Sequence, residues 1–309
     1  MRGRESAGVR YGFIGLGHLG APLAASLRAA GFDLTVHDRD EARAAPLLEA
    51  GAGWAESPAA LAASVDAVIT CLPSPAASTA VLTGPNGILE GAALGLAWIE
   101  MSTNDADEVA KLSAAAAAKG VRMLECPVTG GVHKAALGEI TVIVGGDAEL
   151  FAAHRPALEA MGGEIHHVGP LGQAATIKVI TNMLAFIHLL AAGEALMLAK
   201  KGGLDLAQAF NVIRASSGNS FVFETEGQLI LNGSYDIDFT MDLACKDLGF
   251  AMGIGRTHGV PLDLAALTAQ TFLRGRATYG GGANSTQIVK LLEDALGTDL
   301  RAPGFPAHL

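Results

Sequence analysis

A glycine-rich turn between an apolar run and a helix-like segment constrains the fold of this chain most strongly. Gly15-x-Gly17-x-x-Gly20 directly follows the apolar run Tyr11–Ile14. The first glycine permits a tight turn, the second a close approach of the backbone, and the third close packing of helix on strand. The start of the helix then offers free N–H groups to phosphates. The turn therefore predicts a dinucleotide site. Its residues are Gly15, Leu16, Gly17, His18, Leu19 and Gly20.

An acidic residue at the expected distance supports this interpretation. Asp38 follows Gly20 by eighteen positions and ends a second apolar run. Its carboxylate can accept hydrogen bonds from both ribose hydroxyls and would repel a 2′-phosphate, so the sequence favours NAD over NADP. Arg39 leaves the choice of cofactor open, because it can stack on the adenine or bind a 2′-phosphate if Asp38 turns away.

Short apolar runs alternate with alanine-rich, helix-like segments through the first half of the chain. This pattern is typical of a doubly wound, mostly parallel sheet with helices on both faces, as in the Rossmann fold. We therefore expect an α/β dinucleotide-binding domain over residues 1–171. The expected strands are Tyr11–Ile14, Leu34–Val36, Ala67–Cys71, Leu96–Met101, Val121–Cys126 and Ile140–Val144.

Helical periodicity replaces the strand pattern after Gly172. A long helix from about Gln173 to Lys200 is expected to link the first domain to an all-helical substrate and oligomerisation domain over residues 172–309. Its apolar stretch carries Asn182 and Glu194, which are expensive in lipid, so we expect a buried helix of a soluble protein. Ligands of such sheets bind at the carboxyl ends of the strands, which places the expected chemistry between the domains. Later helices are expected at Asp205–Ala215, Phe221–Leu231 and Met241–His258.

Composition excludes several classes of partner. The net charge of −10 argues against nucleic acid or an anionic membrane, because both reward a basic surface. Three cysteines without a CxxC pair indicate free thiols in a reducing compartment, hence the cytoplasm. The polar N-terminus, through Arg10, reads as a loose tail and lacks the apolar core of a signal peptide. The histidines lack metal-ligand spacing, so no metal is expected.

Three further segments follow expected strands and can carry chemistry. Leu72 and Pro73 could pack against a nicotinamide ring, or the proline could simply end the strand. Ser102 and Thr103 could bond a ribose or carboxamide, or cap the next helix. The segment Thr129-Gly130-Gly131 offers a hydroxyl and two accessible backbone N–H groups to a small anion such as a carboxylate, although paired glycines are often plain turns.

Two polar residues interrupt the long apolar helix. Lys178 and Asn182 are four residues apart, so they project from the same helix face. The lysine is either a surface residue whose stem covers apolar area or a functional group with a lowered pKa. The companion asparagine and the expected position between the domains favour function.

Taken together, these segments resemble the β-hydroxyacid dehydrogenase family, which includes 3-hydroxyisobutyrate dehydrogenase and tartronate semialdehyde reductase. The resemblance rests on Gly12–Ala24, Cys126–Gly131, Gly169–Asn182 and Lys246-Asp-Leu248, in the family's order. Glu125 stands where many members have aspartate, Cys126 where many have alanine, and Thr129 where serine is common.

The resemblance implies roles for individual residues and a reaction. Lys178 would be the general acid/base, with a pKa near the working pH. Asn182 would help hold the substrate, and Thr129, Gly130 and Gly131 would cradle its carboxylate. Lys246 would contact the cofactor near the nicotinamide. The implied activity is NAD(P)-dependent interconversion of a small β-hydroxy acid and its semialdehyde or keto form, in a homodimer or homotetramer.

Two alternatives remain open from the sequence. One is an oxidative decarboxylase of a β-hydroxy acid, although the chain shows no basic cluster suited to a sugar phosphate. The other is a cofactor-binding sensor without catalysis, against which the Lys178 and Asn182 pair argues.

Overall fold

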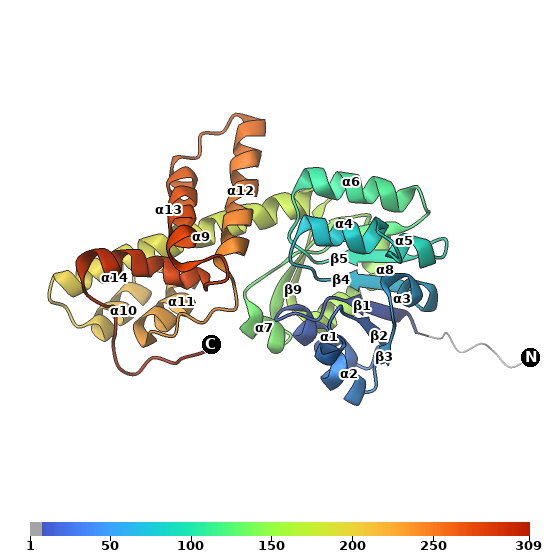
Figure 1. Cartoon of the computed structure of the whole chain (residues 1–309), viewed down its shortest axis with the longest axis horizontal. Coiled ribbons are helices and arrows are strands. Elements are labelled where there is room, and N and C mark those ends of the chain that lie inside the picture. Colours follow the sequence, from blue (N-terminus) through green and yellow to red (C-terminus); the bar gives the residue numbers. More distant parts are fainter. Residues whose placement is uncertain (1–7) are drawn as a thin grey trace, which may run out of the picture. The chain divides into compact units, whose positions relative to one another are not determined.

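The structure, a computed structural model, describes residues 8–309 (Figure 1). The chain divides into two compact units, one ending at Lys178 and the other covering Val179–Leu309. This division lies inside the helix α9, whereas the predicted boundary between residues 171 and 172 precedes it. Most of the expected N-terminal tail, through residue 7, lies outside the described residues.

A mixed sheet forms the centre of the first unit. Its strands follow the order β3-β2-β1-β4-β5-β6-β8-β7, and β9 pairs with β8. The pairs among β1 to β6 are parallel, whereas β8 runs antiparallel to β6 and β7. The chain order reverses between β1 and β4, which is where ligands bind in such sheets. The bounds are β1 Arg10–Ile14, β2 Asp33–His37, β3 Gly53–Trp54, β4 Ala67–Thr70, β5 Ala97–Glu100, β6 Arg122–Glu125, β7 Val128–Thr129, β8 Ile140–Gly146 and β9 Gly162–Gly169.

Helices cover both faces of this sheet because successive strand residues point to opposite sides. On β5, Ile99 joins the core formed with α1 and α8, whereas Trp98 joins the core formed with α3, α4 and α6. The predicted α/β Rossmann architecture is therefore confirmed. The helices are α1 Gly20–Ala29, η1 Glu41–Ala44, α2 Ala45–Glu49, α3 Pro58–Ser64, α4 Pro75–Thr83, α5 Ile88–Gly91, α6 Ala106–Ala117, α7 Val132–Ala136 and α8 Ala148–Met161.

The second unit is helical, as predicted, and α9 belongs to both units. Its core gathers Leu196 of α9, Phe210 of α10, Phe223 of α11, Leu248 of α12 and Phe272 of α13. Helices α12 and α13 lie side by side (Figure 1). The bounds are α9 Gln173–Lys201, α10 Leu206–Arg214, α11 Phe221–Asn232, α12 Met241–His258, α13 Asp263–Tyr279, η2 Ser285–Val289 and α14 Lys290–Leu296.

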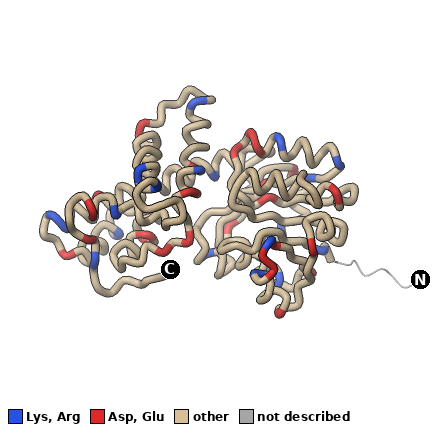
Figure 2. The backbone as a smooth tube through the Cα atoms, in the orientation of Figure 1, with Lys and Arg blue, Asp and Glu red and all other residues tan. Residues whose placement is uncertain are grey.

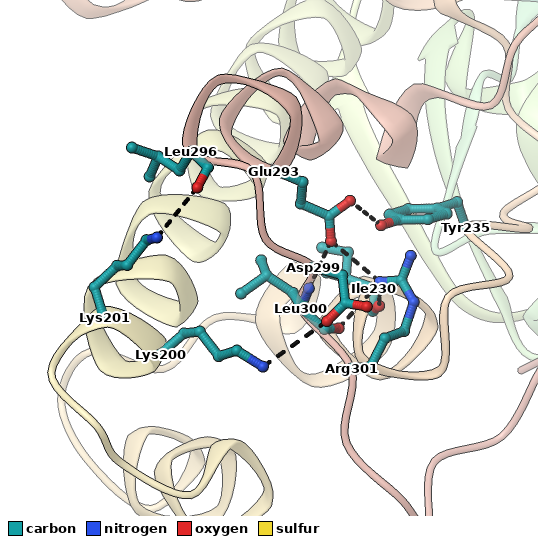
Figure 3. Close-up of polar contacts among 9 residues, drawn as sticks. All are labelled: Lys200, Lys201, Ile230, Tyr235, Glu293, Leu296, Asp299, Leu300 and Arg301. Atoms are coloured by element: carbon teal, nitrogen blue, oxygen red, sulfur yellow. Dashed lines mark hydrogen bonds and ion pairs between the residues drawn. The ribbon is translucent and has the colours of Figure 1, made fainter.

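A buried carboxylate on α14 holds the C-terminal segment in the second unit. Glu293 is 6% exposed and accepts hydrogen bonds from the Tyr235 hydroxyl at 2.5 Å and the Arg301 guanidinium at 3.1 Å (Figure 3). Nearby, the Lys200 ammonium at the end of α9 lies 3.8 Å from the Asp299 carboxylate. These contacts connect the end of α9 to the segment that follows α14.

Two short strands and the packing of the C-terminal segment are not visible in the local sequence pattern. Strands β3 and β7 have two residues each, too few for an apolar alternation to be visible. The last nine residues pack on the second unit. The Phe305 ring lies 5.0 Å from the Phe210 ring, and its carbonyl accepts a hydrogen bond from Asn232. Phe305 stands between glycine and proline, which are typical of loops, so the sequence of this segment does not indicate that its aromatic ring packs against a helix.

Helix α9 is long and apolar enough, by length and composition alone, to cross a membrane. In its most apolar window 39% of the residues are buried, so it is less enclosed than expected. Leu184 and Leu198 are exposed on it, at 45% and 76%. Apolar side chains occur on all sides of this helix, and the rest of the chain buries only some of them.

Lys and Arg positions are interspersed with Asp and Glu positions along the backbone of both units (Figure 2). Exposed ion pairs join Arg10 to Asp66 at 2.8 Å and Arg122 to Asp147 at 2.7 Å. Such exposed pairs contribute little to stability in water. The stability of each unit therefore rests mainly on its apolar core.

One enclosed carboxyl group predicts a pH-dependent stability. The Oε2 atom of Glu226 on α11 is buried and has no hydrogen-bond partner among residues 8–309, and burial raises the pKa of this group from 4.5 to about 8. Between these values the unfolded chain ionises while the folded chain keeps its proton, so stability falls as pH rises. We expect Glu226→Gln to stabilise the fold by roughly 1–3 kcal/mol at pH 8–9 and little at pH 4.

Chemical denaturation at several pH values checks this expectation. Glu194→Gln provides the control, because it makes the same chemical change at an exposed position of α9. A gain for Glu226→Gln that is equal at pH 4 and pH 9 would contradict the proposed titration.

Candidate active site

The glycine-rich turn lies where the strand order reverses. It joins β1 to α1 and packs against the end of β4. Gly15 has a φ of +99°, and a Cβ there would lie 2.4 Å from the Cys71 carbonyl oxygen. A Cβ on Gly20 would lie 1.9 Å from the Gly15 carbonyl oxygen. Both glycines are therefore needed for close backbone packing, as the motif predicts.

The start of α1 is suited to phosphates. Leu19 at its N-cap makes no side-chain cap, and the first turn holds no acidic residue. A Cβ on Gly17 would have the Arg43 guanidinium at 3.7 Å as its nearest neighbour, so this side of the turn is open. A positive helix end and an open approach fit the pyrophosphate of a dinucleotide. His18 and Leu16 complete the turn with their backbones.

Asp38 lies at the end of β2, within reach of this turn. One carboxylate oxygen accepts a hydrogen bond from the Leu16 amide at 2.6 Å, and the other from the Asp40 amide at 2.9 Å. The carboxylate is thus fixed beside the glycine-rich turn, where a ribose would lie.

A second arginine, Arg43, places its guanidinium beside the glycine-rich turn. Arg39 is exposed, and within residues 8–309 it forms no hydrogen bond or ion pair. Arg43, on η1, lies near Gly17 and 3.5 Å from the Asp40 carboxylate. The sequence analysis missed Arg43, although it follows Arg39 by four residues.

A buried network aligns the ends of β4 and β5. Glu100 is 1% exposed and accepts hydrogen bonds from the Thr70 hydroxyl at 3.0 Å and the Ser102 amide at 2.7 Å. The Ser102 hydroxyl accepts a hydrogen bond from the Leu72 amide at 2.8 Å. Trp98 donates its indole N–H to Thr70. The two segments expected to contact the cofactor are therefore joined directly, with Pro73 exposed beside them.

The helix-cap alternative for Ser102 and Thr103 is wrong. Helix α6 is capped by Asp105, whose carboxylate accepts a hydrogen bond from the Glu108 amide at 2.8 Å. Thr103 lies one residue beyond Ser102, at the carboxyl end of β5. Asn104 is 2% exposed, and its amide atoms lack hydrogen-bond partners in the described part of the chain.

The expected substrate loop connects β7 to α7. Thr129 ends β7, where it pairs with Thr141 of β8. Gly130 and Gly131 have φ values of +124° and +91°, which other residues rarely adopt. The Lys134 stem lies 3.3 Å from the Cβ position of Gly130. The positive φ angles orient the amides of this loop in directions that a residue with a Cβ atom could adopt only with strain.

Glu125, at the end of β6, binds the first turn of α9. One carboxylate oxygen accepts hydrogen bonds from the amides of Gly172 at 2.6 Å and Ala174 at 2.9 Å, and the other from Ala175 at 3.1 Å. Burial raises the pKa of Glu125, while these amide bonds act in the opposite direction. Lys178, on the next turn of α9, is 7% exposed.

A second polar chain lies in the helical unit. Asn182, 8% exposed, donates to one oxygen of Asp247 at 2.6 Å. The Lys246 ammonium donates to the other oxygen at 2.7 Å and lies 5.0 Å from the Phe250 ring. Asp247 itself is 1% exposed. The structure thus brings together Asn182 and Lys246, two predicted site residues that are far apart in the sequence.

Three carboxylates that organise these groups have no predicted role: Glu100, Glu125 and Asp247. Glu100 precedes the predicted Ser102 by two residues, and Asp247 directly follows the predicted Lys246. Glu125 precedes the predicted loop residue Thr129 by four residues. Within the described residues, no group of three or more histidine, cysteine, aspartate or glutamate side chains could hold a metal ion.

Two protein-family models match the chain in succession. The model described as the NAD binding domain of 6-phosphogluconate dehydrogenase matches residues 10–169. The model described as NAD-binding of NADP-dependent 3-hydroxyisobutyrate dehydrogenase matches residues 172–292. Together they span both units.

Individual relatives are similar over nearly their whole length. The chain is 33% identical to 2-(hydroxymethyl)glutarate dehydrogenase of Eubacterium barkeri, covering 94% of this chain and 97% of the relative. It is 33% identical to L-threonate dehydrogenase of Cupriavidus necator, covering 91% and 95%. The solved structure of 3-hydroxyisobutyrate dehydrogenase from Salmonella typhimurium has a TM-score of 0.85 at 30% identity, covering 92% and 99%. With the nucleotide turn and the two matching models, this likeness shows that the chain belongs to the β-hydroxyacid dehydrogenase family and is an NAD(P)-dependent oxidoreductase acting on a hydroxy acid.

Proposed function

We propose that this enzyme interconverts a small β-hydroxy acid and its semialdehyde or keto form, with Lys178 as general acid/base. The observation that carries the proposal is a buried lysine on α9, one helical turn from the buried Asn182. A buried amine near an apolar helix surface can lose its proton more readily than one in water. It can therefore accept and return a proton near neutral pH.

The chemistry of the step divides between protein and cofactor. When bound, the nicotinamide would supply an acceptor for the hydride that leaves the carbon bearing the hydroxyl group. The neutral Lys178 amine takes the hydroxyl proton, so that the carbonyl product carries no extra charge. In the reverse direction the protonated amine returns this proton to the oxygen.

Substrate holding falls to the loop Thr129–Gly131 and to Asn182. The loop offers a hydroxyl and backbone amides to the substrate carboxylate. Asn182 is oriented by Asp247, which leaves the amide carbonyl oxygen of Asn182 in a fixed direction. Lys246, bound to the same carboxylate, is proposed to contact the cofactor.

A change of cofactor preference is the expected result of Asp38→Asn. The Asp38 carboxylate would repel a 2′-phosphate, whereas the amide would not. We expect the ratio of kcat/KM with NAD to kcat/KM with NADP to fall by roughly 10-fold, about 1.4 kcal/mol. Steady-state kinetics with both cofactors measure this ratio. Asp33→Asn, at the opposite end of β2, should leave it unchanged. An unaltered ratio in Asp38→Asn would remove the basis for the proposed NAD preference.

The substrate is tested with a panel of hydroxy acids and both cofactors. The panel contains 3-hydroxyisobutyrate, 3-hydroxypropionate, glycerate, serine, threonate and 2-(hydroxymethyl)glutarate. Turnover of at least one β-hydroxy acid supports the proposal. The proposal would be contradicted if the protein bound the cofactor but neither oxidised any member of the panel nor reduced any of the matching aldehydes.

We further propose that the enzyme works in the cytoplasm as a homodimer or homotetramer, with neither nucleic acid nor membrane as a partner. The acidic net charge and the free cysteines support this environment. Light scattering after gel filtration measures the assembly.

A further inference from the structure

The start of α9 lacks a cap of its own. Gly172, the residue before the helix, has no side chain and a φ of +94°. The Gln173 amide bonds to the Pro170 carbonyl, and the Thr176 amide to the Gly172 carbonyl. The amides of the two residues in between, Ala174 and Ala175, have no such local acceptor and bond to Glu125 instead. The hydrogen bonds of the first turn are thus completed by a carboxylate on β6, 47 residues or more away in sequence.

Space for this carboxylate comes from a third element. A Cβ on Gly145 of β8 would lie 2.2 Å from the nearer oxygen of Glu125. Gly145 itself does not have a left-handed backbone, so its conformation does not require glycine. We conclude that position 145 lacks a side chain because Glu125 fills that space. The carboxylate is therefore held between β8 and the start of α9.

A displacement of the first turn of α9 would also displace Lys178, because both belong to the same continuous helix. Lys178 lies three residues beyond Ala175, at a rise of about 1.5 Å per residue. Its side chain is buried, and the Cα–Cβ bonds of a helix tilt toward the helix N-terminus. A misplacement of about 1 Å at a reacting group can lower a rate by about 100-fold.

We infer that Glu125 is the positioning residue for Lys178: its carboxylate fixes the first turn of α9 and thereby places the amine. The inference rests on the proposed role of Lys178. Glu125 touches neither substrate nor cofactor in this account and acts through the helix.

A double-mutant cycle between Glu125 and Gly145 tests the inference. Gly145→Ala should displace the carboxylate and lower kcat by about 10- to 100-fold, while the KM for cofactor changes by less than about 2-fold. The shorter Glu125→Asp makes room for the added methyl group. In the Glu125→Asp background, Gly145→Ala should lower kcat by less than about 2-fold, because the methyl group affects kcat only by displacing the longer carboxylate of Glu125. Gly253→Ala, on α12 with no atom within 4 Å of the added methyl, is the control.

Hydrogen exchange supplies a reading that does not depend on activity. In Glu125→Gln and Gly145→Ala, the amides of Ala174 and Ala175 should exchange faster than in the parent, while those of β1 and β4 keep their protection. Glu125→Gln keeps the size of the side chain and removes its charge, so it complements the cycle if the shorter variant folds poorly.

The outcomes separate this inference from the proposed function. An equal loss from Gly145→Ala in both backgrounds would overturn it, as would loosened amides with an unchanged kcat. If Lys178→Ala kept the parental kcat, the proposed role of the lysine would fail first, whatever the exchange at the start of α9 shows.

Discussion

Replacement of Lys178 by alanine is expected to lower kcat by about 100- to 10,000-fold, the usual contribution of a general acid or base. The variant lacks a group that can take the hydroxyl proton, and no other ionisable residue lies within one turn of Lys178 on α9. Binding of the cofactor should change little, because the glycine-rich turn connects β1 to α1 and Asp38 directly follows β2, away from α9 in the sequence. Steady-state kinetics and fluorescence titration with NADH measure the two effects separately.

Two further variants sharpen this result. Lys178→Arg keeps a positive charge but cannot give up its proton, so it should be nearly as impaired as alanine. Lys200→Ala makes the same change near the other end of α9 and should keep the parental rate. A Lys178→Ala variant with parental kcat would show that another group transfers the proton.

Replacement of Gly20 by alanine should weaken the binding of NAD by roughly 10- to 100-fold, about 1–3 kcal/mol. The new methyl group would lie 1.9 Å from the Gly15 carbonyl oxygen, and backbone cannot turn aside as a side chain can. The start of α1 must therefore move away from the turn. Since the phosphates bind to that helix start, the loss should appear in the dissociation constant for cofactor.

The matched control is Gly253→Ala, which adds the same methyl group inside α12 without any neighbour within 4 Å. There alanine should leave cofactor affinity unchanged and stabilise the helix by about 0.5–1 kcal/mol. Equal affinity in Gly20→Ala and the parent would mean that the turn does not bind phosphates.

Local sequence patterns were sufficient to predict the close packing of the glycine-rich turn and the position of Asp38 after the second strand. The turn Gly15–Gly20 and Asp38 each follow from chemistry within a few residues, namely backbone approach and charge. The confirmed alternation of strands and helices rests on the same kind of short-range signal. The predicted helix Met241–His258 agrees with α12 at both ends, because Thr240 supplies a side-chain cap and Gly259 a left-handed stop.

Long-range partners could not be predicted in this way. Glu100, Glu125 and Asp247 act on residues that are distant in sequence, and nothing in the local pattern names those residues. The choice left open at Ser102, between a cofactor contact and a helix cap, has the same origin. Its hydroxyl bonds to Leu72 on a neighbouring strand, while Asp105, three residues later, caps the helix. The side chains of Ser102 and Asp105 could each cap a helix, and only the packing of the sheet determines which of them does so.

The contact between Glu125 and Gly145 limits how these positions can diverge among relatives. A glutamate at 125 leaves no room for a methyl group at 145, whereas a shorter acid would. Divergence should therefore proceed in order, with shortening of the acid preceding any gain of a side chain on β8. Ancestral reconstruction should find glycine at 145 wherever glutamate occupies 125, and alanine there only on branches that had already acquired aspartate.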